Sequence, residues 1–337
     1  MELGLTTFAE THPTGGDGPV PTAGERLRQV VEEAVATEAA GLDVYGVGEH
    51  HRKDFAASSP AMVLAAIASR TERIQLTSAV TVLSSDDPVR VYQDFSTLDG
   101  LSNGRAELMA GRGSFIESFP LFGYDLADYD ELFEEKLALL LKIREEGPLT
   151  WSGKFRAPLT DAIVYPRTEN RPLPVWIAVG GSPESVIRAG LLGLPLAIAI
   201  IGGEPARFKP LVDLYHRALE EGGQEPQPIA VHAHGYVAET DEQAVADFYA
   251  PYARAMTGIG RERGWGPMTR EQFAGLRSQS GSLFVGTPDH VASKIADVRD
   301  TLGLDRFMLH TSVGTLPHDK VLRNIELLGE KVAPRVR

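Results

Sequence analysis

The chain has 337 residues, of which 43% are hydrophobic and 23% are charged, a composition typical of a globular protein with a buried core. Its formal net charge of −13 disfavours binding to nucleic acid or to anionic membranes, and the absence of cysteine excludes disulfides and thiolate metal sites. The N-terminal residues lack a secretory signal pattern, and no apolar run reaches the roughly 18 residues of a membrane span, so a cytoplasmic protein is the default expectation.

Short apolar runs alternate with helical patterns in the first half of the chain. Strands are predicted over residues 3–8, 42–47, 73–83 and 104–113, and helices over residues 23–41, 59–72, 87–102 and 128–146. The segment 149–166 indicates a small hairpin.

The same alternation continues to the end of the chain. Strands are predicted over residues 173–181, 194–201, 228–239 and 304–311, and helices over residues 182–193, 204–223, 287–303 and 316–334. Residues 240–283 are polar, helical and rich in glycine, and they form an insertion before the last strand–helix unit.

Eight strand–helix units over this length predict a parallel sheet with right-handed crossovers. We therefore expect one α/β domain over residues 1–337, built as a (β/α)8 barrel with insertions. A doubly wound open sheet is the alternative, because periodicity alone does not separate the two folds. In a barrel, functional groups lie at the carboxyl ends of the strands.

The segment "GEHHRKDF" (residues 48–55) follows the second predicted strand, so Glu49, His50 and His51 lie at that end. Neighbouring residues of an extended segment point to opposite sides, and one histidine is expected to face the barrel mouth. An imidazole there suits a general base or a hydrogen-bond donor, because its usual pKa is near neutrality. One alternative is a structural histidine bonded to loop carbonyls. A metal ligand is a second alternative with less support, because the helical spacing typical of zinc-binding histidines is missing.

Two other segments predict an anion site. "AGRGSF" (residues 110–115) places Arg112 between two glycines at the end of the fourth strand. "VGGSPES" (residues 179–185) has the glycines, the capping serine and the first-turn proline of a helix start whose N–H groups can bind phosphate. The two segments together could grip one phosphate, although an internal salt bridge and an ordinary turn explain each of them separately.

Three further histidines lie on the last two predicted barrel strands, and two nucleotide-binding motifs are missing. His232 and His234 share one face of the seventh predicted strand and His310 ends the eighth; each can line the mouth or be structural. Neither a P-loop nor a dinucleotide-binding G-x-G-x-x-G after a strand is present.

The segments "GVGEHH", "SAVTVLSSDDPVR", "LSNGRAELMAGRGSF" and "VWIAVGGSPES" occur in the same order as in the bacterial luciferase-like flavin-dependent monooxygenase family, which the chain resembles over essentially its whole length. The resemblance implies a luciferase-like (β/α)8 barrel in which His50 is the catalytic base. The resemblance places Ala79 and Val80 at a non-proline cis peptide beneath the flavin ring. It places the following residues at the cofactor phosphate: Arg112, Gly113, Ser114, Gly180, Gly181 and Ser182.

The activity implied by this resemblance is oxygenation of a small organic substrate with reduced FMN and O2, without a metal ion. Because no NAD(P)H fingerprint is present, a separate NAD(P)H:flavin reductase is expected to supply the reduced flavin. Residues 240–283 are expected to act as a lid, and the apolar stripe of the 128–146 helix, beyond what packs on the barrel, could contribute to a homodimer. The alternatives are hydride transfer with the deazaflavin F420, a non-catalytic flavin-binding protein, and a phosphate-sugar aldolase or isomerase.

Overall fold

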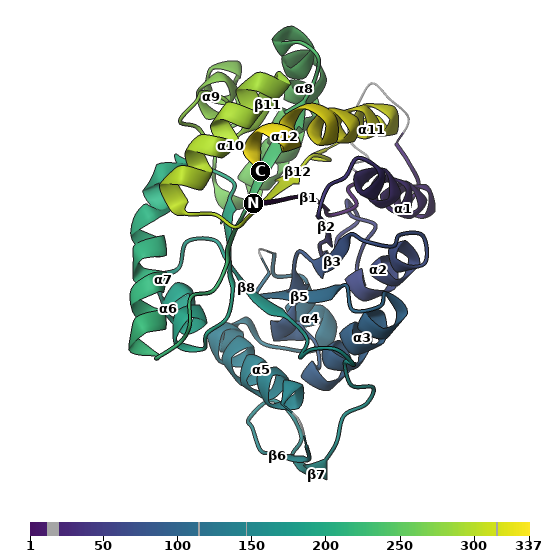
Figure 1. Cartoon of the computed structure of the whole chain (residues 1–337), viewed down its shortest axis with the longest axis vertical. Helices are drawn as coiled ribbons and strands as arrows, with labels where there is room; N and C mark the ends of the chain where they lie inside the picture. The colour runs from purple at the N-terminus through teal and green to yellow at the C-terminus, as the bar shows by residue number, and fades with distance from the viewer. Residues whose placement is uncertain (12–19, 114, 146, 315) are drawn as a thin grey trace.

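The computed structural model describes residues 1–11, 20–113, 115–145, 147–314 and 316–337, and its centre is a closed barrel of eight parallel strands (Figure 1). The barrel strands are β1 (Glu2–Thr7), β2 (Val44–Val47), β3 (Gln75–Ser78), β5 (Ala106–Gly111), β8 (Val175–Val179), β9 (Leu196–Ile200), β10 (Ile229–Val237) and β12 (Arg306–His310). Each strand pairs with its neighbour in chain order, and β12 pairs with both β1 and β10. This closure confirms the barrel and rules out the open doubly wound sheet.

A ring of helices surrounds the strands (Figure 1). The helices that follow the barrel strands are α1 (Ala23–Ala39), α2 (Pro60–Ala68), α3 (Pro88–Leu101), α5 (Tyr129–Arg144), α6 (Pro183–Leu191), α7 (Lys209–Glu221), α10 (Pro288–Leu302) and α11 (His318–Leu327). Side chains cap several of these starts: Thr22 forms a capping box with Glu25, and Asp87 accepts bonds from the first turn of α3.

The structure adds several elements to those expected. The third predicted strand is divided into β3 and a short β4 (Thr81–Val82), and α4 (Ser118–Phe122) follows β5. The predicted hairpin is confirmed as β6 (Leu149–Trp151) and β7 (Leu159–Ala162). The insertion consists of α8 (Asp241–Arg263) and α9 (Arg270–Leu276) and ends at β11 (Phe284–Gly286), a strand that pairs with the end of β10. The last predicted helix continues past α11 as a π-turn and α12 (Ala333–Val336).

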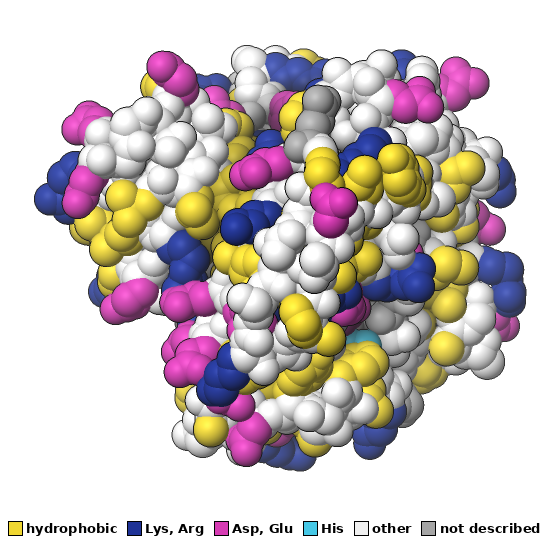
Figure 2. Space-filling model, turned by 90° about the horizontal axis from the view of Figure 1, so that it is seen from below, with side chains coloured by type: hydrophobic (Ala, Val, Ile, Leu, Met, Phe, Trp, Pro, Cys, Tyr) yellow, Lys and Arg dark blue, Asp and Glu magenta, His cyan; other side chains and the backbone are white. Residues whose placement is uncertain are grey.

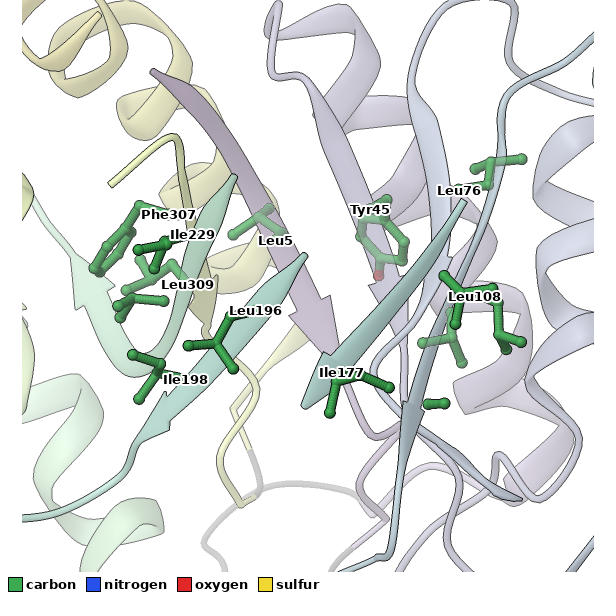
Figure 3. Packing of buried hydrophobic residues seen from close by; sticks show 14 of the residues in the cluster. Leu5, Tyr45, Leu76, Leu108, Ile177, Leu196, Ile198, Ile229, Phe307 and Leu309 are labelled. Atoms are coloured by element: carbon green, nitrogen blue, oxygen red, sulfur yellow. The ribbon is translucent and has the colours of Figure 1, made fainter. Parts of the chain in front are cut away.

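Alternate residues of each strand pack outward against the helices and form the main hydrophobic core. Every barrel strand contributes to it, as Figure 3 illustrates with Leu5, Tyr45, Leu76, Leu108, Ile177, Leu196, Ile198, Ile229, Phe307 and Leu309. The intervening residues point into the barrel, where Val44, Met109 and Met308 belong to a separate buried cluster. The barrel is therefore a packed core whose open end carries the site.

Buried charges close the opposite end of the barrel interior. Arg306 forms ion pairs with Glu107 and Glu2 at 2.6 Å each, and its guanidinium lies 4.5 Å from the centre of the Trp176 ring. The two carboxylates neutralise the buried guanidinium of Arg306, so these side chains have a structural role at the amino ends of the strands.

The surface carries acidic and basic side chains interspersed with hydrophobic ones on the face seen in Figure 2. Within the described ranges, no helix combines the length and the apolar character needed to cross a lipid bilayer.

The insertion packs on the barrel through a small core of its own. Tyr236 and Val285 from the strands meet Phe248, Tyr252 and Phe273 from α8 and α9. Lys294 of α10 is fully buried, and its Nζ donates to three carbonyl oxygens at the end of the insertion, those of Leu276 (3.3 Å), Ser278 (2.6 Å) and Leu283 (2.8 Å). One ammonium group thus fixes the return of the insertion to the barrel.

We expect Lys294→Met to lower the free energy of unfolding by about 3 kcal/mol, because three carbonyl groups, that of Leu283 fully buried, lose their shared donor. Urea unfolding followed by circular dichroism measures this change. The matched control is Lys209→Met, which removes an exposed ion pair with Asp213 and should cost under about 0.5 kcal/mol. Equal effects of the two substitutions would show that Lys294 does not anchor the insertion.

Candidate active site

The mouth, meaning the barrel end at the carboxyl ends of the strands, is lined on one side by small residues. Gly46 and Ala79 come from the β2 and β3 side, and Gly111, Ala178 and Ala199 come from β5, β8 and β9. Ala178 and Ala199 lie within strands, and Ala178 packs with the interior cluster, yet both remain partly exposed. Solvent therefore reaches the interior wall of the barrel at this end.

The segment between β3 and β4 is packed tightly against its neighbours. Its Ala79–Val80 peptide is cis, as the family resemblance implied. A Cβ atom added to Gly48 would lie 2.9 Å from the carbonyl oxygen of Ala79, and one added to Gly111 would lie 2.8 Å from Cγ2 of Val80. Both glycines are thus required for the adjoining strands to approach residues 79 and 80.

Glu49 supports the same segment from β2. Its Oε2 accepts a hydrogen bond from the backbone N–H of Val82 at 2.8 Å, and its Oε1 lies 2.8 Å from Nε2 of His51. The acid and the second histidine of the "GEHH" motif are therefore engaged with each other and with β4. The prediction that only one of the two histidines faces the mouth agrees with this arrangement.

His50 lies in a box of three aromatic rings. The centre of its ring is 4.7 Å from that of Phe8, 4.3 Å from that of Phe55 and 5.2 Å from that of Phe115. Burial among these rings lowers the pKa of His50 to about 4, so its imidazole is neutral at pH 7. This pKa departs from the usual imidazole value because three aromatic side chains from separate loops surround the imidazole.

A buried polar network lies below Phe8. Nε2 of His310 is 2.6 Å from Oε1 of Glu10, and Ser312 donates to the other carboxylate oxygen at 2.9 Å. Burial raises the pKa of Glu10, but the interaction with His310 outweighs it and holds this pKa at about 2. Glu10 belongs to no recognisable motif, and only its nearness to the first strand could have indicated it.

His232 and His234 stand beside His310 on the same wall. Their ring centres lie 5.4 and 5.3 Å from that of His310, and they are 8% and 6% exposed. Burial lowers the pKa of His232 to about 3 and that of His234 well below its usual value. Nε2 of His232 and Nδ1 of His234 have no hydrogen-bond partner among the described residues. Within the same part of the chain, no cluster of three metal-binding side chains occurs.

Arg112 and the start of α6 meet at the rim of the mouth, as predicted. Nη2 of Arg112 donates to Oγ of Ser185 at 3.1 Å, and Nη1 pairs with Asp130 of α5. Ser182 caps α6 by accepting from the N–H of Ser185. The sequence did not reveal Asp130, which gives the guanidinium an acidic partner in this structure.

The glycines of the anion site differ in their surroundings. A Cβ added to Gly180 would meet no atom within 4 Å, and Gly181 has φ of +124°, a backbone conformation that favours glycine. Gly113 also has positive φ, and its carbonyl oxygen accepts from the Tyr129 hydroxyl at 3.0 Å. Ser114, the remaining predicted contact, lies outside the described residues.

Comparison with known proteins gives one family and a consistent fold. A family model described as luciferase-like monooxygenase matches residues 1–306. A monooxygenase from Streptomyces bottropensis, RslO1, superposes with a TM-score of 0.86 at 22% identity over 100% of both chains. The oxygenating constituent of 3,6-diketocamphane monooxygenase from Pseudomonas putida, solved with FMN, gives a TM-score of 0.78 at 21% identity over 100% of this chain and 99% of that one. A relative from Amycolatopsis mediterranei, F420-dependent glucose-6-phosphate dehydrogenase, is 33% identical over 46% of this chain and 48% of its own.

The free energy of unfolding is expected to fall as the pH drops from about 6.5 towards 4, because unfolded histidines bind protons while His50, His232 and His234 stay neutral in the fold. Their contribution is fully present above the unfolded pKa and is lost as the pH falls through this window. Each histidine adds a slope of about 1.4 kcal/mol per pH unit.

Urea unfolding over this pH range tests the expectation with two variants. His232→Gln should reduce the slope by about one proton, whereas His216→Gln, at an exposed position, should leave it unchanged. A slope that is the same in His232→Gln and in the unsubstituted protein would contradict a neutral buried His232.

Proposed function

The chain belongs to the luciferase-like monooxygenase family, and from this premise we propose that it is a flavin-dependent monooxygenase using reduced FMN and O2 to oxygenate a small organic substrate. The observation that carries the proposal is the meeting of Arg112 with the first turn of α6 beside a mouth lined by small residues. This arrangement offers an anion site and a flat, apolar floor next to each other, as a phosphorylated ring cofactor requires.

The phosphate half of the site consists of Arg112 and two backbone turns. Arginine binds phosphate through its planar fork, and the free N–H groups at the start of α6 add donors. Gly180 borders open space, so a phosphate can approach the backbone there. In this proposal the groups that hold the phosphate are Arg112, Gly113, Ser114, Gly180, Gly181 and Ser182.

The phosphate would exchange places with a protein carboxylate. Asp130 pairs with Arg112, and Glu184 accepts from the Ser182 hydroxyl at 2.8 Å, so acidic groups already occupy part of the anion site. Asp130 is largely exposed and can move into water when a phosphate takes its place.

The ring half of the site is the small-residue side of the mouth. Ala79 and Val80 would lie under the flavin ring, and Gly111 keeps the floor beside them flat. When bound there, reduced flavin supplies the electrons that activate O2. The protein contributes position and the exclusion of water.

His50 is the proposed catalytic residue, acting in its neutral form. A neutral imidazole can donate one hydrogen bond and accept another, so His50 can receive or return a proton at a reacting oxygen atom. The rings of Phe8, Phe55 and Phe115 keep water from its edges. The lowered pKa keeps His50 neutral at pH 7, and this favours donation of a hydrogen bond through its ring N–H to a reacting oxygen atom.

Three further parts of the proposal concern partners and motion. A separate NAD(P)H:flavin reductase would supply the reduced flavin, since no dinucleotide fingerprint occurs in the sequence. The insertion, residues 240–283, would serve as the lid. A homodimer remains a prediction; Leu132, Phe133, Leu137 and Leu140 of α5 are buried within this chain, so only the remainder of the predicted apolar stripe, such as the partly exposed Leu141, is available to it.

F420-dependent hydride transfer is the second candidate, because a relative in the same family carries that activity in its name. A direct competition between FMN and F420 for the purified protein decides between them, and we expect FMN to bind more tightly. Tighter binding of F420 would replace the oxygenase proposal with hydride transfer, and binding of neither would reject both.

Arg112→Gln should weaken FMN binding by roughly 10- to 100-fold, because a charged phosphate contact is lost. The affinity for riboflavin, which has no phosphate, should change by less than about twofold, since the ring half is untouched. Asp130→Asn should tighten FMN binding by about threefold, because the competing carboxylate is removed. Fluorescence titration measures all three affinities, and equal losses for FMN and riboflavin would place the phosphate elsewhere.

His50→Gln should reduce turnover by about a hundredfold while FMN affinity stays within about twofold. The measurement mixes the complex of protein and reduced FMN with O2 and follows flavin reoxidation beside that of free reduced FMN. In the unsubstituted protein, reoxidation should differ in rate from that of free flavin, and His50→Gln should shift that rate. Reoxidation that is identical with and without protein would contradict the monooxygenase proposal.

A further inference from the structure

Three segments that are far apart in the sequence meet at the guanidinium group of Arg52, which lies in the loop after β2. Nη1 donates to Oε1 of Glu117, before α4, at 2.7 Å. Nη1 and Nη2 also donate to the two carboxylate oxygens of Glu262 at 2.8 and 2.5 Å. Glu262 lies in the last turn of α8, the long helix of the insertion. Arg52 therefore joins the insertion to two loops of the mouth by a two-pronged pairing of the kind that arginine makes best.

The same guanidinium contacts the wall of the His50 box. It lies 4.5 Å from the centre of the Phe115 ring, and Phe115 packs against both His50 and Phe55. One side chain thus touches the end of the insertion on one side and an aromatic neighbour of the proposed catalytic residue on the other. Arg263 of α8 also lies over the Phe115 ring, at 5.9 Å from its centre, so a movement of the end of α8 would change the packing of Phe115 from two sides.

Glu262 occupies a position that α8 by itself does not favour. The carbonyl ends of a helix carry partial negative charge, so an acid in the last turn is unfavourable unless a cation compensates it. Arg261 and Arg263 lie in the same turn and compensate part of this charge, and Arg52 adds the two-pronged ion pair that only the docked position of α8 provides. Gly264 ends the helix directly afterwards with positive φ. The Arg52–Glu262 pair therefore stabilises the docked position of the insertion.

We propose that Arg52 is a positioning residue that latches the insertion over the mouth through Glu262 and holds Phe115 against His50. Flavin and substrate then enter and leave when the Arg52–Glu262 pair opens. The part of this inference that concerns flavin rests on the proposed function, whereas the latch itself does not.

Hydrogen exchange of the ligand-free protein, followed by mass spectrometry, tests the latch alone. In Glu262→Gln, peptides covering residues 255–264 should exchange about fivefold faster, as expected for loss of a partly exposed charged pair. Glu117→Gln is the matched control, because it also removes one acidic partner of Arg52, but one that lies outside the insertion. In this variant, the exchange rate of residues 255–264 should stay within about twofold of that in the unsubstituted protein. Equal exchange in the unsubstituted protein and Glu262→Gln would overturn the latch.

Stopped-flow binding of oxidised FMN tests the coupling to the mouth. Glu262→Gln should raise both the association and the dissociation rate by about fivefold and leave their ratio within about twofold, because a gate changes passage more than affinity. Raising the salt concentration screens the phosphate contact in both proteins but the Arg52–Glu262 pair in only one, so the rates of the unsubstituted protein should approach those of Glu262→Gln. If Glu262→Gln shows faster hydrogen exchange but unchanged rates of FMN binding and release, the coupling between the latch and the mouth would be overturned.

Arg52→Lys separates the charge from the shape of the latch. Lysine keeps the charge but lacks the fork, so both rates should fall between those of the unsubstituted protein and Arg52→Gln. Rates for Arg52→Lys as fast as those for Arg52→Gln would support the fork, and rates as slow as those of the unsubstituted protein would overturn its role. If neither FMN nor F420 binds at all, the proposed function fails, while the hydrogen exchange still decides the latch.

Discussion

The closure of the barrel between the last strand, β12, and the first, β1, is the constraint on which the rest of the molecule depends. The register across this closing pair sets His310 beside Thr6, and the neighbouring β10–β12 pair sets His234 beside His310. Because side chains alternate along a strand, a closed ring with fixed registers decides which residues enter the mouth and at what depth. Groups from opposite ends of the chain, such as Glu10 and His310, become neighbours only because the ring closes.

The closed ring gives the mouth two unlike sides. On the side from β2 to β9, the mouth is lined by the small residues Gly46, Ala79, Gly111, Ala178 and Ala199, which leave room for a flat molecule. The seam strands carry His232, His234 and His310, with Glu10 and Ser312 above them, and they form a stiff polar wall. His50 stands between the two sides in its aromatic box, and Glu49 couples its loop to β4 by the bond to Val82. A change on either side therefore acts on His50 through packing and not only through charge.

Features that depend on periodicity and local chemistry could be predicted from the sequence. Contacts between loops that are distant in the sequence could not. Eight strand–helix units, the hairpin, and the meeting of Arg112 with the start of α6 could be read from spacing and capping residues. The cis peptide at Ala79–Val80 was implied by the family resemblance, whereas the division of the third strand there was not predicted, because propensity favours a continuous strand. The partners of exposed charges, such as Asp130 and Glu262, obey no period, so their contacts with Arg112 and Arg52 appear only in three dimensions. The lowered pKa of His50 needs Phe8, Phe55 and Phe115 together, and no single segment contains them.

The two arginines at the rim share one electrostatic design: each cation already has acidic partners, Asp130 for Arg112, and Glu117 with Glu262 for Arg52. Under the proposed function, this design would let a protein with a net charge of −13 receive an anionic cofactor. The phosphate would replace the exposed carboxylate of Asp130 at Arg112, and the gain would be the difference between two ion pairs rather than the strength of one. Such an exchange would give moderate affinity and fast release, which suits the proposed use of a reduced flavin that arrives and leaves in each cycle. At Arg52 both acidic partners are protein side chains and no ligand takes part. The proposed opening and closing of the Arg52–Glu262 pair therefore leaves the net charge of the mouth unchanged.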